Sequence, residues 1–152
     1  MESRFGRIRA FVDTNVLIDF FAGDRVSSNS SEILFQAAQN GIVELFLTTQ
    51  SFLDAAYISS HTYKLKKQHF VSGALSLMSF VNIEYIDFFD LKNALSGDMG
   101  GLNDIEDAAQ YAHAEGLGCD VIVTSDKRFI RQRDISGGPA IMTPDEFVAR
   151  MK

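Results

Sequence analysis

The 152-residue sequence predicts an α/β fold in which a parallel β-sheet is covered by helices on both faces. Short apolar segments rich in β-branched residues alternate along the chain with segments whose apolar residues recur at helical spacing. Hydrophobic residues make up 46% of the chain, which is typical of a globular protein. No internal repeat or linker-like stretch divides the sequence, so we expect a single domain over residues 1–152.

Five segments are predicted to be strands. The first is a short apolar run, IRAFV, which ends abruptly at a carboxylate. The third alternates partly with period 2, and the fourth is rich in β-branched residues. In chain order the predicted strands are Ile8–Val12, Val43–Thr49, Val81–Phe88, Asp120–Ser125 and Ala140–Met142.

Helical segments are predicted between these strands. One starts near Val16, directly after the first strand. The last one has Thr143 as its N-cap, Pro144 at its first position and Glu146 placed to close a capping box. The other predicted helical regions are Ser30–Gly41, Ser51–Ser60, Phe70–Phe80 and Asn103–Gly116, and the last helix covers Thr143–Met151.

Charge and composition narrow the function classes. Fourteen basic and twenty acidic residues give a net charge of −6, which argues against nucleic-acid binding through overall charge alone. A nuclease is not excluded, because acids that bind a divalent metal reverse their own local field. No apolar run approaches the roughly 20 residues of a bilayer span, and the N-terminus lacks a secretion signal. We therefore expect a cytoplasmic protein without membrane contact, in agreement with its single cysteine, Cys119.

Carboxylates follow several of the predicted strands. Asp13 directly follows the first strand, Asp54 lies five residues after the second, and Asp126 directly follows the fourth. In open parallel sheets, ligands bind beyond the carboxyl ends of the strands, near the point where the strand order reverses. A further acidic group reaches the same edge if the loop ending at Asn103 brings the next helix start there. This group contains Asp104, Glu106 and Asp107.

The chemistry of gathered carboxylates points to a cation. Neighbouring carboxylates raise each other's pKa, so a positive partner is needed to keep them ionised. Mg²⁺ or Mn²⁺ is the natural partner of an oxygen-only site, and it polarises a phosphate and activates water. The three histidines, His61, His69 and His113, lie on helical segments without the spacing of a zinc site.

Each acid also has a purely structural interpretation. Asp13 is equally a candidate for the N-cap of the following helix. Asp54 is placed to complete a capping box with Ser51. Asp107 fits as a first-turn acid that favours the helix dipole, and Asp126 fits as a turn residue after a strand. Only the joint placement of these acids favours a functional site.

Several segments, in matching order, resemble the PIN-domain nucleases, and in particular the VapC-type toxins of toxin–antitoxin pairs. They are VDTNVLID at 12–19, the helix start Ser51–Asp54, NDIEDAAQYAHA at 103–114, VIVTSDKRF at 121–129 and TPDEFV at 143–148. The resemblance covers essentially the whole chain and implies a three-layer α/β/α fold with sheet order 3-2-1-4-5. It further implies an endoribonuclease that depends on Mg²⁺ or Mn²⁺, has RNA as substrate, pairs with an antitoxin protein and forms a homodimer.

The resemblance also assigns residues. It places the catalytic acids at Asp13, Asp54, Asp107 and Asp126, and the metal ligands at Asp13, Asp107 and Asp126, with Asp104 as the alternative to Asp107. The family often has Glu where this chain has the shorter Asp54, so Asp54 is not expected among the direct ligands. The supporting polar positions are Thr14, Asn15 and Ser125. The expected contacts to the RNA backbone are Lys127 and Arg128, with Arg131 and Arg133 nearby, although a solvated basic stretch explains these residues equally well.

Two other functions stay open at this point. A phosphatase with an aspartyl nucleophile also begins with an acid after the first strand, but it needs a second Asp two residues further on, where this chain has Asn15. A non-catalytic PIN fold that binds RNA or a partner protein is the other alternative. The presence of Asp13, Asp107 and Asp126 argues against such a degenerate site.

Overall fold

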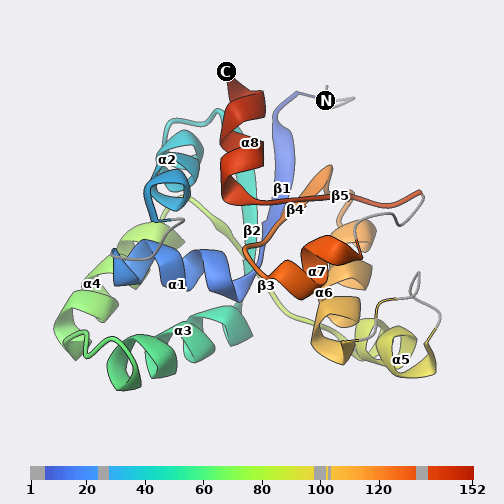
Figure 1. Ribbon diagram of the computed structural model, residues 1–152, viewed down its shortest axis with the longest axis horizontal. Coiled ribbons are helices and arrows are strands. Elements are labelled where there is room, and N and C mark those ends of the chain that lie inside the picture. Colours follow the sequence, from blue (N-terminus) through green and yellow to red (C-terminus); the bar gives the residue numbers. More distant parts are fainter. Residues whose placement is uncertain (1–5, 24–27, 98–101, 103, 133–136) are drawn as a thin grey trace.

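The computed structural model of the chain describes residues 6–23, 28–97, 102, 104–132 and 137–152. Its centre is a five-stranded parallel sheet with the order β3-β2-β1-β4-β5 (Figure 1). The predicted fold class and strand order are confirmed, whereas the single-domain organisation over residues 1–152 stays a prediction. The strands are β1 (Ile8–Val12), β2 (Val43–Thr48), β3 (Asn82–Glu84), β4 (Val121–Val123) and β5 (Ala140–Met142).

Helices cover both faces of the sheet. Helices α1 to α4 and α8 lie on one side and α5 to α7 on the other, which gives three layers (Figure 1). None of the helices in the described part of the chain combines the length and apolar character that a bilayer span requires. The helices are α1 (Thr14–Ala22), α2 (Ser28–Gln39), α3 (Thr49–His61), α4 (Lys67–Met78), α5 (Phe88–Ser96), α6 (Ile105–Gly116), α7 (Lys127–Arg131) and α8 (Pro144–Met151).

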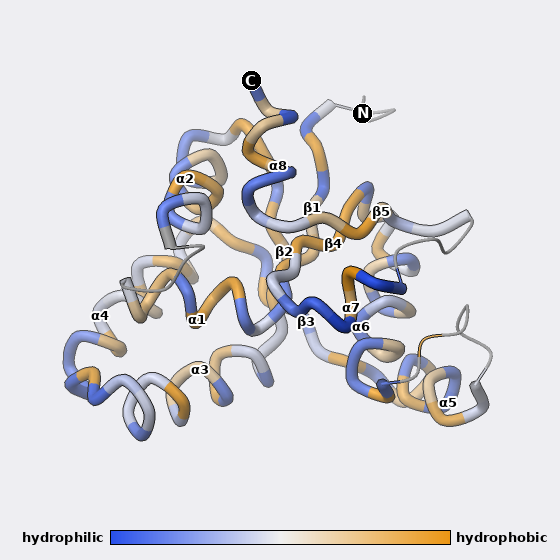
Figure 2. The backbone as a smooth tube through the Cα atoms, in the orientation of Figure 1, coloured by the Kyte–Doolittle hydropathy of each residue, from blue (hydrophilic) through white to orange (hydrophobic). Residues whose placement is uncertain are grey.

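The central strands are buried because both of their faces are covered. In β1, Ala10 and Val12 belong to the core beneath α1 to α4 and α8, whereas Phe11 between them belongs to the core beneath α6 and α7. This alternation follows from the period-2 geometry of a strand. Strands buried on both faces read as continuous apolar runs, and Figure 2 shows hydrophobic residues gathered along β1, β4 and β5.

The third predicted strand is wrong in its length. Strand β3 covers only Asn82–Glu84, and the chain from Phe88 onward forms helix α5, which the sequence analysis did not predict. Asp87 and Asp90 start this helix through a reciprocal capping box. The short helix α7 was also not predicted, and the fourth strand ends at Val123 because Asp126 caps α7.

The strand order places a switch point beside β1. The chain moves outward from β1 through β2 to β3, then returns to place β4 on the opposite side of β1. The ladder between these two strands continues for one residue, because the backbone N–H of Asp13 donates to the carbonyl oxygen of Val123 at 3.0 Å. Ligands of open parallel sheets bind at such a point, and the acids described below lie there.

Candidate active site

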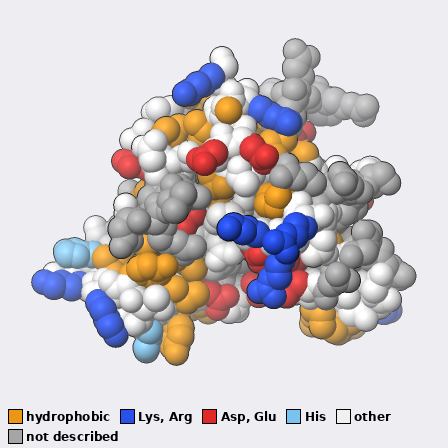
Figure 3. All heavy atoms as spheres, in the orientation of Figure 1, with side chains coloured by type: hydrophobic (Ala, Val, Ile, Leu, Met, Phe, Trp, Pro, Cys, Tyr) orange, Lys and Arg blue, Asp and Glu red, His pale blue; other side chains and the backbone are white. Residues whose placement is uncertain are grey.

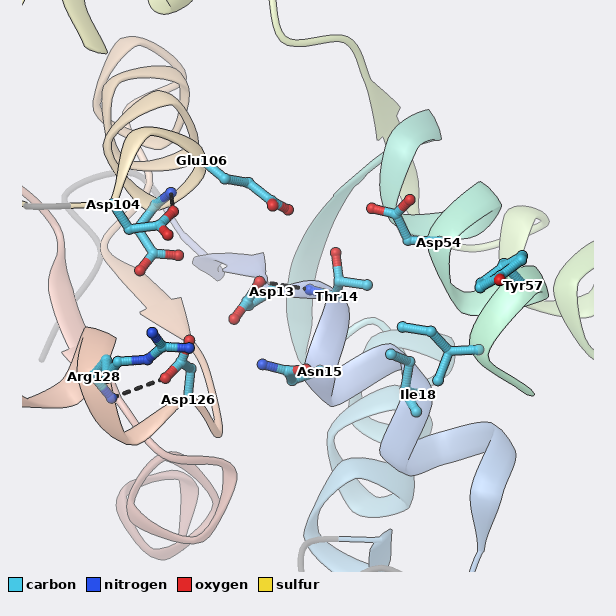
Figure 4. Close-up of a pocket in the computed structure, with 12 residues that line it drawn as sticks. Asp13, Thr14, Asn15, Ile18, Asp54, Tyr57, Asp104, Glu106, Asp126 and Arg128 are labelled. Atoms are coloured by element: carbon cyan, nitrogen blue, oxygen red, sulfur yellow. Dashed lines mark hydrogen bonds between the residues drawn. The ribbon is translucent and has the colours of Figure 1, made fainter. Parts of the chain in front are cut away.

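A cavity of about 330 Å³ opens at the carboxyl ends of β1 and β4 (Figure 4). Residues from the starts of α1, α6 and α7 and from α3 line it. The four predicted catalytic acids all lie there, and so do Asp104 and Glu106. We call this the acid cavity; its six carboxylates are those of Asp13, Asp54, Asp104, Glu106, Asp107 and Asp126.

Asp13 is both a helix cap and a cavity-lining acid. One carboxylate oxygen accepts a hydrogen bond from the N–H of Thr14 at 2.7 Å, as in a capped helix, and the other accepts from the Thr124 hydroxyl at 2.7 Å. Burial raises the pKa of Asp13; the hydrogen bonds from Thr124, Thr14 and Gln110 lower it, and the charge of Asp126 raises it further. The two interpretations of Asp13 are therefore compatible.

Asp107 lies in the first turn of α6 and is buried, with 7% of its surface exposed. Its N–H donates to the side chain of Asp104, which is the N-cap of this helix, at 3.0 Å. Burial raises the pKa of Asp107 to about 7, and the charges of Asp13, Asp104, Asp126 and Glu106 contribute in that order. Such a large pKa shift is typical of a site where several carboxylates lie close together without a positively charged partner.

Asp126 is the N-cap of α7, where its side chain accepts from the N–H of Arg128 at 2.8 Å. Its own N–H donates to the hydroxyl of Thr124 at 3.1 Å. Because Thr124 also donates to Asp13, this fully buried hydroxyl connects two acids of the cavity. Thr124 was not among the predicted supporting residues, although it lies in the VIVTSDKRF segment.

Ser125 occupies a different environment from the one expected for a supporting residue of the acid cavity. Its hydroxyl donates to the buried carboxylate of Asp19 at 3.1 Å, and it does not line the cavity. Consecutive side chains after a strand point to opposite sides, so Thr124 faces Asp13 while Ser125 faces α1. The other two predicted supporting residues, Thr14 and Asn15, line the cavity.

Thr14 fixes the start of α1 against the start of α3. Its hydroxyl lies 2.8 Å from that of Ser51, which accepts a hydrogen bond from the Thr48 hydroxyl at 3.0 Å. The N-cap of α3 is Thr48, so the interpretation of Asp54 as the partner of Ser51 in a capping box is wrong. Asp54 instead lies further along α3 and faces the cavity, where its carboxylate accepts from the side chain of Gln50 at 2.8 Å.

Glu106 and Gln110 complete the wall that α6 contributes. Glu106 reaches between Asp13 and Asp54 in Figure 4, and burial, followed by the charges of Asp13, Asp54 and Asp104, raises its pKa. Gln110, one turn later and buried, donates to Glu106 at 3.4 Å and also bonds to Asp13. Glu106 was expected only as a member of the acidic helix start and not as a site residue, and no role was predicted for Gln110.

Basic residues lie at one end of the acid cavity. Arg128 lines it, and an adjoining cavity of about 410 Å³ is lined by Arg128, Arg131 and Gln132 together with three of the acids. Figure 3 shows this group of basic side chains directly beside the acids. Lys127 is exposed but does not line the acid cavity, and Arg133 lies outside the described residues.

The donor set suits a hard divalent cation. It consists of carboxylate oxygens from four different elements, the type of ligand that Mg²⁺, Mn²⁺ and Ca²⁺ take in proteins. Among the described residues, no lysine or arginine forms an ion pair with Asp13, Asp107 or Asp126. A cation would thus compensate charges that the described residues leave without a cationic partner.

A second group with metal-ligand chemistry lies outside the acid cavity. Potential ligand atoms of Asp87, Asp90 and His113 lie within 4.8 Å of one another. However, the imidazole of His113 already bonds to Asp90 at 2.6 Å through Nδ1 and to Glu84 at 3.3 Å through Nε2. Both ring nitrogens of His113 are thus already engaged by carboxylates of the protein itself.

Residues 10–135 match the PIN domain family model. The chain belongs to the PIN domain family. It is 25% identical over 142 residues to ribonuclease VapC1 of Aquifex aeolicus (strain VF5), an alignment that covers 93% of this PIN domain chain and 94% of that protein.

Solved structures share the PIN fold. VapC20 of Mycobacterium tuberculosis, described as a sarcin–ricin loop cleaving toxin, superposes with a TM-score of 0.64 at 13% identity and covers 86% of this chain and 99% of that one. PAE2754 of Pyrobaculum aerophilum has a TM-score of 0.60 at 15% identity, with 95% of each chain covered. A toxin–antitoxin complex from Klebsiella pneumoniae has a TM-score of 0.58 at 20% identity, with coverage of 89% and 97%.

Proposed function

We propose that this PIN domain is a metal-dependent endoribonuclease that hydrolyses RNA phosphodiester bonds. The observation that carries the proposal is the convergence of uncompensated carboxylates at the switch point of the sheet, where burial and mutual repulsion raise the pKa of Asp107 to about 7. The relative named ribonuclease VapC1, which aligns over almost the whole chain, supports the same activity.

In the proposed site, Asp13, Asp107 and Asp126 would hold Mg²⁺ or Mn²⁺. Such an ion, when bound, polarises the phosphate and lowers the pKa of an attacking water. The chain orients its acids through fixed donors: Thr124 and the N–H of Thr14 hold both oxygens of Asp13. This support keeps the charged groups in place before substrate arrives, which is the main requirement for electrostatic catalysis.

The remaining polar groups of the cavity would contact either the attacking water or the RNA phosphates. Asp54 and Glu106 lie on the side of the acid cavity away from Arg128 (Figure 4), where their carboxylates would accept hydrogen bonds from an attacking water. Arg128, with Arg131 and Lys127 beyond it, binds the RNA phosphates, which supply much of the affinity in nucleic-acid complexes. Asn15 lies at the cavity between these two ends and is placed to donate to a phosphate oxygen.

We further propose that the protein is the toxin of a type II toxin–antitoxin pair, acts as a homodimer in the cytoplasm and consists of one PIN-like domain. The motif resemblance to VapC-type toxins and the name of the Aquifex relative support the toxin role. The toxin role predicts that a small antitoxin gene lies beside the gene of this protein and that overexpression of the protein arrests growth. Normal growth on overexpression of a chain that cleaves RNA in vitro would contradict it.

The ribonuclease proposal is tested by cleavage of RNA with Mn²⁺ or Mg²⁺, with and without a chelator. Asp13→Asn is expected to slow cleavage by about 100-fold or more, because removing one ligand charge costs several kcal/mol of transition-state stabilisation. Glu115→Gln, an exposed acid at the other end of α6, is the matched control and should leave the rate unchanged. Cleavage that survives both chelation and Asp13→Asn would refute the proposal.

The two alternatives give different results in the same preparation. A non-catalytic PIN module has no working metal site, so calorimetric titration with Mn²⁺ should show no binding that Asp13→Asn removes. An aspartyl-nucleophile phosphatase should form a trappable phosphoenzyme at Asp13. Its pattern lacks support here, because the position of the second Asp holds Asn15.

A further inference from the structure

An exposed aromatic side chain stands at one end of the acid cavity. Tyr57 lines the cavity from α3, one turn beyond Asp54, at the end opposite Arg128 (Figure 4). The residue remains 64% exposed. The side of α3 that packs into the protein is formed by other residues, namely Ser51, Phe52, Ala55 and Ser59. Tyr57 is therefore not held in place by core packing.

A second ring holds Tyr57 in place. The imidazole of His61, one turn further along α3, stacks on the phenol ring with centroids 4.0 Å apart and an interplanar angle of 23°. His61 Nδ1 donates to the carbonyl oxygen of Tyr57 at 2.9 Å, which fixes the orientation of the imidazole. One face of the Tyr57 ring is thus covered by His61, and the 64% exposure of the residue leaves ring surface accessible to a planar ligand.

We propose that Tyr57, backed by His61, is a nucleobase-stacking subsite that holds one unpaired base of the RNA next to the scissile phosphate. The inference rests on the proposed ribonuclease function and adds to it a pair of residues that contacts a base of the RNA. Aromatic side chains bind unstacked bases in this way, and every base offers a face for stacking. The subsite thus selects for an unpaired base rather than for one particular base.

The distribution of charge along the cavity sets the path of the strand. The phosphates that follow Arg128 and Arg131 lie at the basic end, the acids occupy the middle, and Tyr57 receives the base at the far end. A cavity of about 330 Å³ has the size of a small-ligand site. A paired base inside a duplex cannot enter it without first being unstacked.

The test measures binding and cleavage separately. The affinity of a fluorescent single-stranded RNA is measured by anisotropy in an Asp107→Asn background, which prevents turnover. Tyr57→Ala is expected to weaken binding by about 5- to 100-fold, the range for loss of one base–aromatic stack. Tyr57→Phe should stay within about twofold of the parent, because the ring face is kept. Phe88→Ala, which removes an aromatic residue of similar exposure (70%) on α5, is the control.

A double-mutant cycle locates the base. Once the cleaved bond has been mapped, an abasic nucleotide is placed at each position around it in turn. At one position the abasic RNA should lose affinity for the parent but not for Tyr57→Ala, since the shared contact is already absent. In cleavage by the otherwise native chain, Tyr57→Ala should raise KM more than it lowers kcat.

The outcomes separate the two proposals. Cleavage by the native chain with equal RNA affinity of Tyr57→Ala, Tyr57→Phe and the parent would overturn the stacking subsite alone. The stacking subsite would also be overturned if the loss of RNA affinity from Tyr57→Ala and the loss from the abasic nucleotide simply added at every position. Absence of RNA cleavage by the native chain would overturn the ribonuclease proposal and the subsite with it.

Discussion

The carboxylates beside His113 and those of the acid cavity differ in the partners that the protein provides for them. Glu84 and Asp90 each bond to one nitrogen of the same imidazole, so the histidine joins β3, α5 and α6 in one hydrogen-bonded group. In the part of the chain that the structure describes, Asp13 accepts hydrogen bonds from neutral donors and neither Asp13 nor Asp107 pairs with a lysine or arginine; burial raises the pKa of both. Carboxylates that bond to a histidine of the same protein stabilise the fold. Carboxylates without such a partner are available to a cation.

The largest expected effect is on the rate of RNA cleavage, and it distinguishes the roles of Asp107 and Asp104 at the start of α6. Asp107→Asn should slow cleavage by about 100- to 1,000-fold through loss of a buried ligand. Asp104→Asn removes the same charge from the rim of the cavity, and asparagine caps a helix as well as aspartate does. We expect it to stay within about tenfold of the parent. A reversed order would make Asp104 the ligand.

The next effect is the pH dependence of stability without metal. The pKa of Asp107 rises from 3.8 to about 7 on folding, so between these values the native state binds more protons than the unfolded state. Stability should consequently fall as the pH rises from about 4 to about 7. Chemical unfolding in EDTA at pH 5 and pH 8 measures this, and Asp107→Asn should flatten the profile.

The same experiment with metal provides the complementary measurement. A divalent cation that binds only the native state should restore stability at pH 8, by about 2.7 kcal/mol at 100 times its Kd. The gain should be smaller at pH 5, where protons compete for the carboxylates. An equal gain at both pH values, or in Asp107→Asn, would show that the cation binds elsewhere.

Substitution in the group around His113 should lower stability but leave RNA cleavage nearly unchanged. His113→Gln removes one of two hydrogen bonds to carboxylates, since an amide cannot donate in both directions. We expect a loss of about 2 kcal/mol in unfolding free energy and cleavage within about threefold of the parent. A loss of cleavage with unchanged stability would mean that this group takes part in function.

The sequence and the structure agree best where a residue's role follows from its position in the chain. Asp13, Asp54 and Asp126 were located because parallel strands end at one edge. Helix α5 was missed because the aromatic and β-branched residues Tyr85, Ile86 and Phe88 favoured a strand. The unused signal of a helix start was the pair Asp87 and Asp90, three residues apart.

The supporting residues of the cavity could not be predicted in the same way. Thr124 and Ser125 are both small hydroxyl residues after β4, and only the direction of each side chain decides that Thr124 meets Asp13 while Ser125 meets Asp19. Gln110 reaches Asp13 because α6 packs across the strand ends, which is a tertiary contact. His113 likewise finds its two carboxylates on β3 and α5.

The smallest effect concerns how the uncompensated acids are held. Thr124→Val keeps the shape of the buried side chain but removes the hydroxyl that donates to Asp13 and accepts from Asp126. We expect cleavage to fall about tenfold, as for loss of an outer-shell contact in a metal site. Ser125→Ala, the neighbouring hydroxyl, removes only a bond to Asp19 and should leave cleavage within about twofold. An equal change in cleavage rate in the two variants would mean that the Thr124 hydroxyl has no specific role in orienting the acids. The backbone alone would then hold the cavity.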